Sequence, residues 1–297
     1  MPTLCLGEAL VDLVCERHVD RLPDAEAFVP HPGGATANVA IHAARTGARV
    51  ALGGGAGDDP WGPWLRDRLV AEGVDVGAFR LVAGARTPVA LVWVHRSGEP
   101  EYVIHGEGLA AVATALRDGL EEAVAGADGL FFGSNTLVGD AEREVTLRAR
   151  ELALARELPV VIDANLRLGR WRTAADAAAT VNACVPGAFL VRANAKEAEL
   201  LTGERDPERA ARALLKTGAR LVVITLGAEG AILRGERRAD AEGVAITVRS
   251  TVGAGDALTG TLLGRLALSG FYPSAAAVAL SEAVLASART CERWAAL

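Results

Sequence analysis

The chain alternates short apolar runs with longer Ala-rich segments in which apolar residues recur every three or four positions. The runs at 129–132, 160–163, 189–191 and 221–225 are continuous rather than alternating, which indicates parallel strands covered by helices on both faces. Further strands are predicted at 3–14, 49–53 and 244–248, and helices at 39–46, 61–72, 116–124, 141–156, 254–269 and 273–293. No linker or repeat divides the chain, so we expect one α/β domain over residues 1–297.

The segment between Thr87 and His105 departs from this pattern. Val89, Leu91 and Trp93 alternate with other residues, and a second short run at 101–104 follows the turn-forming residues 96–100. Two such runs around a turn predict a β-hairpin inserted into the α/β domain.

The composition excludes several classes of protein. The 31 basic and 37 acidic side chains give a formal net charge of −6, and only Lys196 and Lys216 are lysines. Neither lysine has the spacing of a G-x-x-x-x-G-K-[ST] phosphate loop, so a nucleotide would have to be bound without that lysine. Arginines dispersed among glutamates argue against a nucleic-acid surface.

The N-terminal segment predicts neither a signal peptide nor a membrane span, because Glu8 and Asp12 interrupt its apolar run. The four cysteines have no zinc or C-x-x-C spacing, and Cys5 and Cys15, which flank an apolar stretch, suit small buried hydrophobes better than disulfides. The five histidines show no metal-site spacing. Glycines at 53–57 do not form a dinucleotide-binding fingerprint, because Asp58 stands at the third glycine position. We expect a reduced, cytoplasmic protein without a membrane partner.

The strongest candidate for a chemical site lies between a predicted strand and a long predicted helix, at residues 250–256. Gly253 and Gly255 allow the backbone to approach a ligand closely, and N–H groups at a helix start favour an anion such as a phosphoryl group. Asp256 would then accept a proton from a nucleophile. The alternative is a glycine-rich turn in which Asp256 only stabilises the first turn of the helix.

Two further candidates lie in the N-terminal part of the chain. Gly33 and Gly34 precede a predicted helix and can cradle a polar ligand, to which Asn38 offers a donor and an acceptor. Asp12 ends a buried strand and needs polar partners, which a ligand with several hydroxyl groups would supply. The alternatives are a plain loop with Asn38 in solvent and a turn in which Asp12 accepts backbone N–H groups.

Polar segments follow three neighbouring predicted strands. They begin at Asp163, Asn194 and Thr225 and end at Arg167, Glu197 and Gly230, respectively. Each alone is ordinary strand-to-helix sequence. Because the carboxyl ends of parallel strands meet at one edge of a sheet, where ligands of open α/β sheets bind, the set together with residues 250–256 predicts one cleft.

The order of these motifs resembles the ribokinase/PfkB family of carbohydrate kinases over nearly the whole chain, and its fructokinase-like branch in the opening residues. The matching residues are Gly7, Glu8, Asp12, Gly33, Gly34, Asn38, Gly57, Asp58, Asp59, Gly62, Gly73, Asp75, Asp163, Asn165, Arg167, Asn194, Glu197, Thr225, Gly227, Gly230, Gly253, Gly255 and Asp256. The resemblance implies a ribokinase-like α/β fold, with a mostly parallel central sheet, helices on both faces and a small β-sheet lid. We expect lid segments at about 15–32 and 84–106.

The resemblance also implies ATP-dependent transfer of the γ-phosphoryl group to a sugar hydroxyl, assisted by Mg²⁺, with a fructokinase as the first expectation. Asp256 matches the family's catalytic base, and the N–H groups of Gly253, Ala254 and Gly255 match its anion hole. Sugar-binding positions map to Asp12, Gly33, Gly34, Asn38 and Arg167. Nucleotide-binding positions map to Asn194, Glu197, Thr225, Gly227 and Gly230, with Glu197 as an indirect contact to the metal. Exposed lid strand edges predict a homodimer formed through the lid.

Three features need to be weighed against the family pattern: the residue at 250, the pair at 104–105 and the residue at 93. Ser250 stands where Asp is common, and Ile104 and His105 stand where fructokinase-like members often carry Tyr-Arg, which weakens the case for an acidic or phosphorylated sugar. Trp93 is either a sugar-stacking residue or a core residue. The remaining alternatives are a 2-keto-3-deoxygluconate kinase, in which Arg167 meets the carboxylate, a nucleoside kinase, and a non-catalytic sugar- or nucleotide-binding relative.

Overall fold

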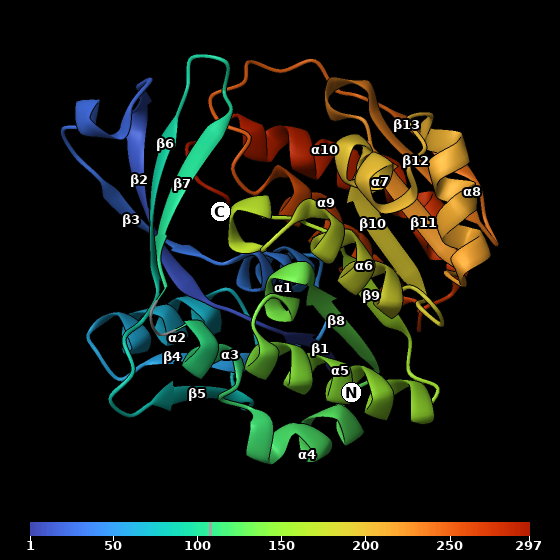
Figure 1. The fold of residues 1–297 in the computed structure, drawn as a ribbon, viewed down its shortest axis with the longest axis horizontal. Coiled ribbons are helices and arrows are strands. Elements are labelled where there is room, and N and C mark those ends of the chain that lie inside the picture. Colours follow the sequence, from blue (N-terminus) through green and yellow to red (C-terminus); the bar gives the residue numbers. More distant parts are fainter. Residues whose placement is uncertain (107–108) are drawn as a thin grey trace.

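A computed structural model describes residues 1–106 and 109–297 and contains two β-sheets (Figure 1). The larger sheet has nine strands and is parallel from β11 to β5, because each βα unit returns the chain to the same edge, whereas β12 and β13 are antiparallel. In spatial order its strands are β13 (Ala239–Glu242), β12 (Gly230–Gly235), β11 (Leu221–Thr225), β10 (Leu190–Asn194), β9 (Val160–Asp163), β8 (Gly129–Gly133), β1 (Thr3–Leu6), β4 (Val50–Gly57) and β5 (Phe79–Val82).

Helices cover both faces of this sheet (Figure 1). One face carries α1 (Ala35–Arg45), α2 (Trp61–Ala71), α9 (Ala254–Leu268) and α10 (Pro273–Cys291). The other carries α4 (Leu120–Ala125), α5 (Asp140–Ala155), α6 (Ala174–Cys184), α7 (Ala195–Thr202) and α8 (Pro207–Thr217), and the short α3 (Leu109–Ala113) contacts β4. Each face of the sheet packs against its helices in a separate hydrophobic core. Because side chains alternate across a strand, Phe131 packs in the core under α1, α2, α9 and α10, while Leu130 and Phe132 pack in the core under α4 to α8.

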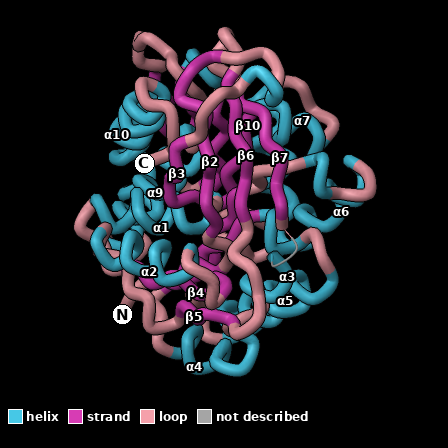
Figure 2. Tube along the Cα trace, turned by 90° about the vertical axis from the view of Figure 1, so that its left-hand side faces the viewer, coloured by secondary structure: helices cyan, strands magenta, loops and turns pink. Residues whose placement is uncertain are grey.

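The smaller sheet is built from four strands in the order β3 (Val29–Gly33), β2 (Leu10–His18), β6 (Val89–Val94) and β7 (Pro100–His105). Figure 2 shows it as a separate set of strands standing across the carboxyl-terminal side of the larger sheet. β2 and β6 are parallel and the outer pairs are antiparallel. One face packs Val14 and Val92 against Val252 and Ala296. The other buries Trp93 beside Cys15.

The α/β fold with a central mostly parallel sheet and a small β-sheet is therefore confirmed, and the predicted hairpin is the β6–β7 pair. Trp93 is a core residue of the small sheet, since it is 7% exposed and packs with Cys15 and Val19. The small sheet also begins earlier than expected, because β2 starts at Leu10 rather than near residue 15.

Three predicted elements were wrong in detail. The apolar run 3–14 is two strands in different sheets, because the chain turns at Gly7, whose φ is 155°. Residues 244–248 form no strand; the antiparallel strands β12 and β13 precede them instead. The run 116–124 divides into a 3-10 turn (Arg117–Gly119) and α4, since Gly119 interrupts the helix.

The four cysteines are buried and free, which confirms the prediction made for Cys5 and Cys15. Burial raises the pKa of the Cys5 thiol, so this group is a small hydrophobe rather than a reactive thiolate. Across residues 1–106 and 109–297, none of the helices combines the length and the apolar content that crossing a membrane requires.

Candidate active site

A pocket opens where the carboxyl ends of the large sheet's strands face the small sheet. Its walls come from β2, α1, the segment after β9 and the first turn of α9, far apart in sequence. Six of the predicted site residues line it: Asp12, Gly34, Asn38, Arg167, Gly253 and Asp256. Gly33, Ala254 and Gly255 do not line it. The sequence analysis did not identify Glu8, Tyr102 and Asn135 as pocket residues, although they also line it.

Asp256 lies in the first turn of α9 and is 6% exposed. Its Oδ2 accepts a hydrogen bond from Asn38 Nδ2 at 2.9 Å, and its Oδ1 accepts one from Asn165 Nδ2 at 3.4 Å. Burial raises the pKa of Asp256 to about 6, although the Asn38 hydrogen bond acts in the opposite direction. A carboxylate with such a pKa is ionised at neutral pH and is still a usable proton acceptor.

Asp12 faces the same pocket from β2 and is also 6% exposed. Burial, followed by repulsion from Asp256, raises the pKa of Asp12 to about 7. Gly33 and Gly34 make this arrangement sterically possible. A Cβ on Gly33 would lie 2.3 Å from Asp12 Oδ2, and Gly34 has a φ of 95° with the Glu8 carbonyl oxygen 2.8 Å from its ideal Cβ position.

The turn before α9 brings backbone N–H groups to the edge of the pocket. Gly253 is the N-cap residue with a φ of 72°, and a Cβ there would lie 2.2 Å from the Cβ of Ala296. The first helical bond runs from Ala257 N–H to the Gly253 carbonyl, so the preceding N–H groups lie outside the helical ladder. Ala254 N–H already donates a hydrogen bond to the Thr251 carbonyl at 3.3 Å.

Ser250 is fully buried at the start of this turn. Its Oγ accepts a hydrogen bond from Val252 N–H at 3.1 Å. The serine at the position where the family commonly has Asp therefore shapes the local turn.

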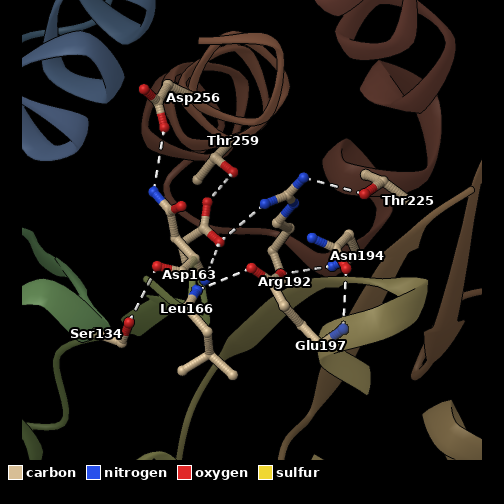
Figure 3. Close-up of polar contacts among 10 residues, drawn as sticks. Ser134, Asp163, Leu166, Arg192, Asn194, Glu197, Thr225, Asp256 and Thr259 are labelled. Atoms are coloured by element: carbon tan, nitrogen blue, oxygen red, sulfur yellow. Dashed lines mark hydrogen bonds and ion pairs between the residues drawn. The ribbon is translucent and has the colours of Figure 1, made fainter. Parts of the chain in front are cut away.

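A buried ion pair joins β9 to β10 beside this turn. Arg192 Nη1 donates to Asp163 Oδ1 at 3.1 Å, and Arg192 Nη2 donates to Thr225 Oγ1 at 3.0 Å (Figure 3). Thr259 of α9 donates to the other Asp163 oxygen at 2.7 Å. The ideal Cβ position of Gly255 lies 2.9 Å from both Nη atoms, so the guanidinium packs against the open side of this glycine.

Arg192 therefore supports the predicted anion-binding turn without lining the pocket, and the sequence analysis did not identify it. Its only signal in the sequence is a charge directly after the continuous apolar run 189–191, at a position now seen to lie inside β10. Its side chain is 8% exposed, and its Nε is buried without a partner among the described residues.

The predicted nucleotide-binding residues lie along the same edge of the sheet but do not line the pocket. Asn194 and Glu197 form a capping box at the start of α7. Glu197 Oε2 accepts Asn194 N–H and Oε1 accepts Leu166 N–H, each at 2.8 Å. Burial raises the pKa of Glu197.

Thr225, Gly227 and Gly230 surround a 3-10 turn (Gly227–Glu229) between β11 and β12. Both glycines have positive φ, at 63° and 102°, and a Cβ on Gly230 would collide with the Ala241 carbonyl. This turn places Thr225 beside Arg192, which links it to Asp163.

Arg167 and Tyr102 close the pocket on the side of the small sheet. The Arg167 guanidinium lies 5.6 Å from the Tyr102 ring centroid, a cation–π distance, and burial raises the pKa of Tyr102. Ile104 lines the pocket, whereas His105 is exposed.

A buried carboxylate at a helix start, free backbone N–H groups and a small sheet over the pocket define a small-molecule kinase on an α/β scaffold. Residues 3–292 match the family model described as "pfkB family carbohydrate kinase". The chain is 33% identical to "Fructokinase-1" of Oryza sativa subsp. japonica over 262 residues, which are 88% of this chain and 81% of that protein.

Solved structures agree with this result. The fructokinase from Vibrio cholerae O395, in a form with fructose, ADP and calcium ion, has a TM-score of 0.84, 27% identity and coverage of 99% of this chain and 94% of that one. The aminoimidazole riboside kinase from Salmonella enterica has a TM-score of 0.83, 26% identity and coverage of 100% and 95%. The chain belongs to the pfkB family of carbohydrate kinases and is a fructokinase-like phosphotransferase that uses a hydroxyl group as acceptor.

Proposed function

We propose that this enzyme transfers the γ-phosphoryl group of ATP to a neutral sugar, with fructose as the first candidate, and that Asp256 is the base that accepts the proton of the attacking hydroxyl. The position of Asp256 supports this most directly, because its buried carboxylate lines the pocket at the N-terminal turn of α9. A hydroxyl held there would meet both a proton acceptor and backbone N–H groups able to bind the transferred group.

On the sugar side, Asp12, Asn38 and Arg167 would bind hydroxyl groups, while Gly33 and Gly34 keep the backbone close to the ligand. Asn38 Oδ1 is buried without a hydrogen-bond partner among the described residues, which suits an acceptor that a sugar hydroxyl satisfies on binding. The Asp12 carboxylate is a second buried acceptor facing the pocket.

On the nucleotide side, the N–H groups of Gly253, Ala254 and Gly255 would hold the transferred phosphoryl, and Asn194, Glu197, Thr225, Gly227 and Gly230 would surround the nucleotide. Both Glu197 oxygens already accept backbone N–H groups, so this residue fits an indirect, water-mediated contact to Mg²⁺. A bound Mg²⁺ ion would neutralise charge on the phosphates.

The small sheet is the proposed lid, and we propose that two copies of the chain pair through it. β3 and β7 are edge strands in that sheet, and edge strands offer unpaired backbone groups to a partner. Four free, buried cysteines fit a reducing, cytoplasmic compartment. Light scattering coupled to gel filtration would measure the proposed dimer.

The test of the proposed function is ADP release from ATP and Mg²⁺ across neutral ketoses and aldoses, sugar acids such as 2-keto-3-deoxygluconate, and nucleosides. We expect the highest kcat/KM with a neutral sugar, and fructose first. A preference for nucleosides, which the similarity to the Salmonella enterica enzyme makes the second candidate, or for a sugar acid would contradict the neutral-sugar assignment. Binding of sugar and ADP without any turnover would identify a non-catalytic relative.

A further inference from the structure

Glu8 is a buried carboxylate that faces the pocket and has no role in the mechanism proposed above. It lies just after β1, is 3% exposed and lines the pocket with Asp12 and Asp256. Its Oε2 accepts a hydrogen bond from Thr36 Oγ1 at 3.2 Å, and its Oε1 accepts one from Asn135 Nδ2, also at 3.2 Å. No basic side chain among the described residues lies within ion-pair distance of it.

Asn135 is itself held in a fixed orientation. It lies in the 3-10 turn after β8 (Ser134–Leu137), and Arg170, in the turn after β9 (Leu168–Arg170), donates from Nη1 to the Asn135 carbonyl at 3.2 Å and to its Oδ1 at 3.3 Å. Because Arg170 is a donor, Asn135 Oδ1 must be the acceptor, and Asn135 Nδ2 therefore points to Glu8. Three strand ends thus fix one carboxylate at the pocket wall.

The hydrogen bonding of Glu8 is incomplete. An ionised carboxylate accepts about four hydrogen bonds, whereas the two donors to Glu8 are both neutral and both at 3.2 Å. A buried charge is costly unless it is well hydrogen-bonded. The remaining capacity of Glu8 suits a donor brought by the ligand, and the donor that a neutral sugar carries is a hydroxyl.

The charges of the pocket also oppose an anionic ligand at this position. Glu8, Asp12 and Asp256 are three buried carboxylates, against Arg167 as the lining residue with a positive charge. A phosphate or carboxylate group beside Glu8 would lie against buried carboxylates, where repulsion between like charges is stronger than in solution.

We propose that Glu8, oriented by Asn135 and Thr36, is a specificity-determining residue that accepts a hydrogen bond from one non-reacting hydroxyl of the sugar and disfavours an anionic group at that place. This inference rests on the proposed sugar kinase function and identifies which side chain selects the neutral substrate class.

The test combines Glu8→Gln with monodeoxy analogues of the neutral sugar that gives the highest turnover. For the parent sugar we expect the KM of Glu8→Gln to rise about tenfold with kcat within about threefold, because a binding contact rather than a transition-state contact is lost. One deoxy analogue should bind wild type about tenfold more weakly than the parent sugar, measured by calorimetry without nucleotide. The same analogue should bind the Glu8→Gln variant at most threefold more weakly than the parent sugar does, since the side chain at position 8 is already a weaker acceptor for the missing hydroxyl.

Glu142→Gln is the matched control, because Glu142 is a buried carboxylate, 6% exposed, that does not line this pocket. It should leave both KM and the deoxy penalties within twofold of wild type. If Glu8→Gln does not fold, Asn135→Ala tests the same contact without changing a buried charge, and a threefold or greater rise in KM is expected.

Two failures are distinguishable. If wild type phosphorylates the parent sugar but the affinity losses from Glu8→Gln and from each deoxy analogue simply add, the role of Glu8 is overturned and the proposed function stands. Absence of ADP release by wild type with every sugar overturns the proposed function, and the Glu8 assignment falls with it.

Discussion

The two sides of the cleft differ in how their buried carboxylates are paired. On the side formed by β9 and β10, Asp163 is paired with Arg192, and both Glu197 oxygens accept backbone N–H groups. Under the small sheet, Asp12 and Asp256 are equally buried, and burial raises the pKa of both. Because a buried carboxylate is costly unless it is paired or hydrogen-bonded, the carboxylates of the first side are satisfied within the protein, whereas we expect those of the second side to gain hydrogen bonds from a ligand.

On the side under the small sheet, Asp256→Asn should give the largest loss of activity. The substitution keeps the shape of the side chain but removes the proposed proton acceptor, so we expect kcat to fall by about 1,000-fold or more. The KM for the sugar should stay within about threefold, because the hydroxyl-binding side chains remain. Steady-state kinetics measure both values. A variant that retains a tenth of the wild-type kcat would show that another group accepts the proton.

Arg192→Met breaks the Asp163–Arg192 ion pair on the side of the cleft formed by β9 and β10. We expect kcat to fall about 100-fold, since the guanidinium that packs against Gly255 and holds Thr225 is lost from a preorganised site. Stability should fall by about 3–5 kcal/mol in urea unfolding, because the buried Asp163 carboxylate loses its cationic partner. The double variant Asp163→Asn with Arg192→Met avoids that charge and should regain stability but not kcat.

Arg234→Met is the control for that loss of a buried arginine. Its side chain is 7% exposed against 8% for Arg192, and it pairs with Glu208 and Asp240, away from the pocket. We expect Arg234→Met to lower stability and to leave kcat within twofold. If both variants lose kcat equally, the contribution of Arg192 is general stability rather than positioning.

Asp12→Asn should make the protein more stable at neutral and alkaline pH and weaken its binding of the sugar. The pKa of Asp12 in the folded protein, about 7, lies above its ordinary value of 3.8, so the neutral acid is favoured by folding. That stability is fully present below about pH 4 and is lost as the pH rises through 7. The variant should therefore be more stable than wild type by roughly 4 kcal/mol at pH 8 and equal to it near pH 4.

Urea unfolding at the two pH values measures this difference, and the KM for the sugar should rise about tenfold in the same variant. Asp67→Asn is the surface control, with a side chain that is 77% exposed, and should show no pH-dependent gain. An equal stability change for Asp12→Asn at both pH values would contradict the buried, unpaired state of this carboxylate.

The pH profile should show the smallest effect. Because the pKa of Asp256 is about 6, kcat/KM of wild type should fall as the pH drops through 6 and the base becomes protonated. Asn38→Ala removes the donor that lowers this pKa, so the acid limb should move to higher pH by roughly half a unit to one unit. A limb that stays in place would separate Asn38 from the titration of Asp256.

Much of the scaffold was predictable because it depends on local patterns. Continuous apolar runs at 129–132, 160–163 and 221–225 predicted strands that the structure places at those positions, and alternation around residues 96–100 predicted the β6–β7 hairpin. The errors arose where periodicity says nothing about partners. Residues 3–14 form one apolar run, yet their two halves pair with different sheets.

The candidate site divides in the same way. Gly253, Gly255 and Asp256 stand out in the sequence because glycine-rich turns before helices are local features. Arg192 and Tyr102 carry no such signal, since a charge after an apolar run and a strand tyrosine are each ordinary. Glu8 stands out only as part of the motif that carries the family resemblance, which assigns it no role in the pocket. All three are joined to the site only through neighbours that lie far away in the chain, such as Asp163, Arg167 and Asn135.

The sequence by itself determined the α/β class and the hairpin, and it predicted a glycine-rich turn before a helix that could bind a phosphoryl group without a phosphate-loop lysine, because each follows from residues close together in the chain. The tertiary structure decided which charges are paired. Asp163 meets a cation from the neighbouring strand, whereas Asp12 and Asp256 meet each other across a pocket. Pairing depends on distance in space, and the packing of the small sheet over the carboxyl ends of the large one sets that distance.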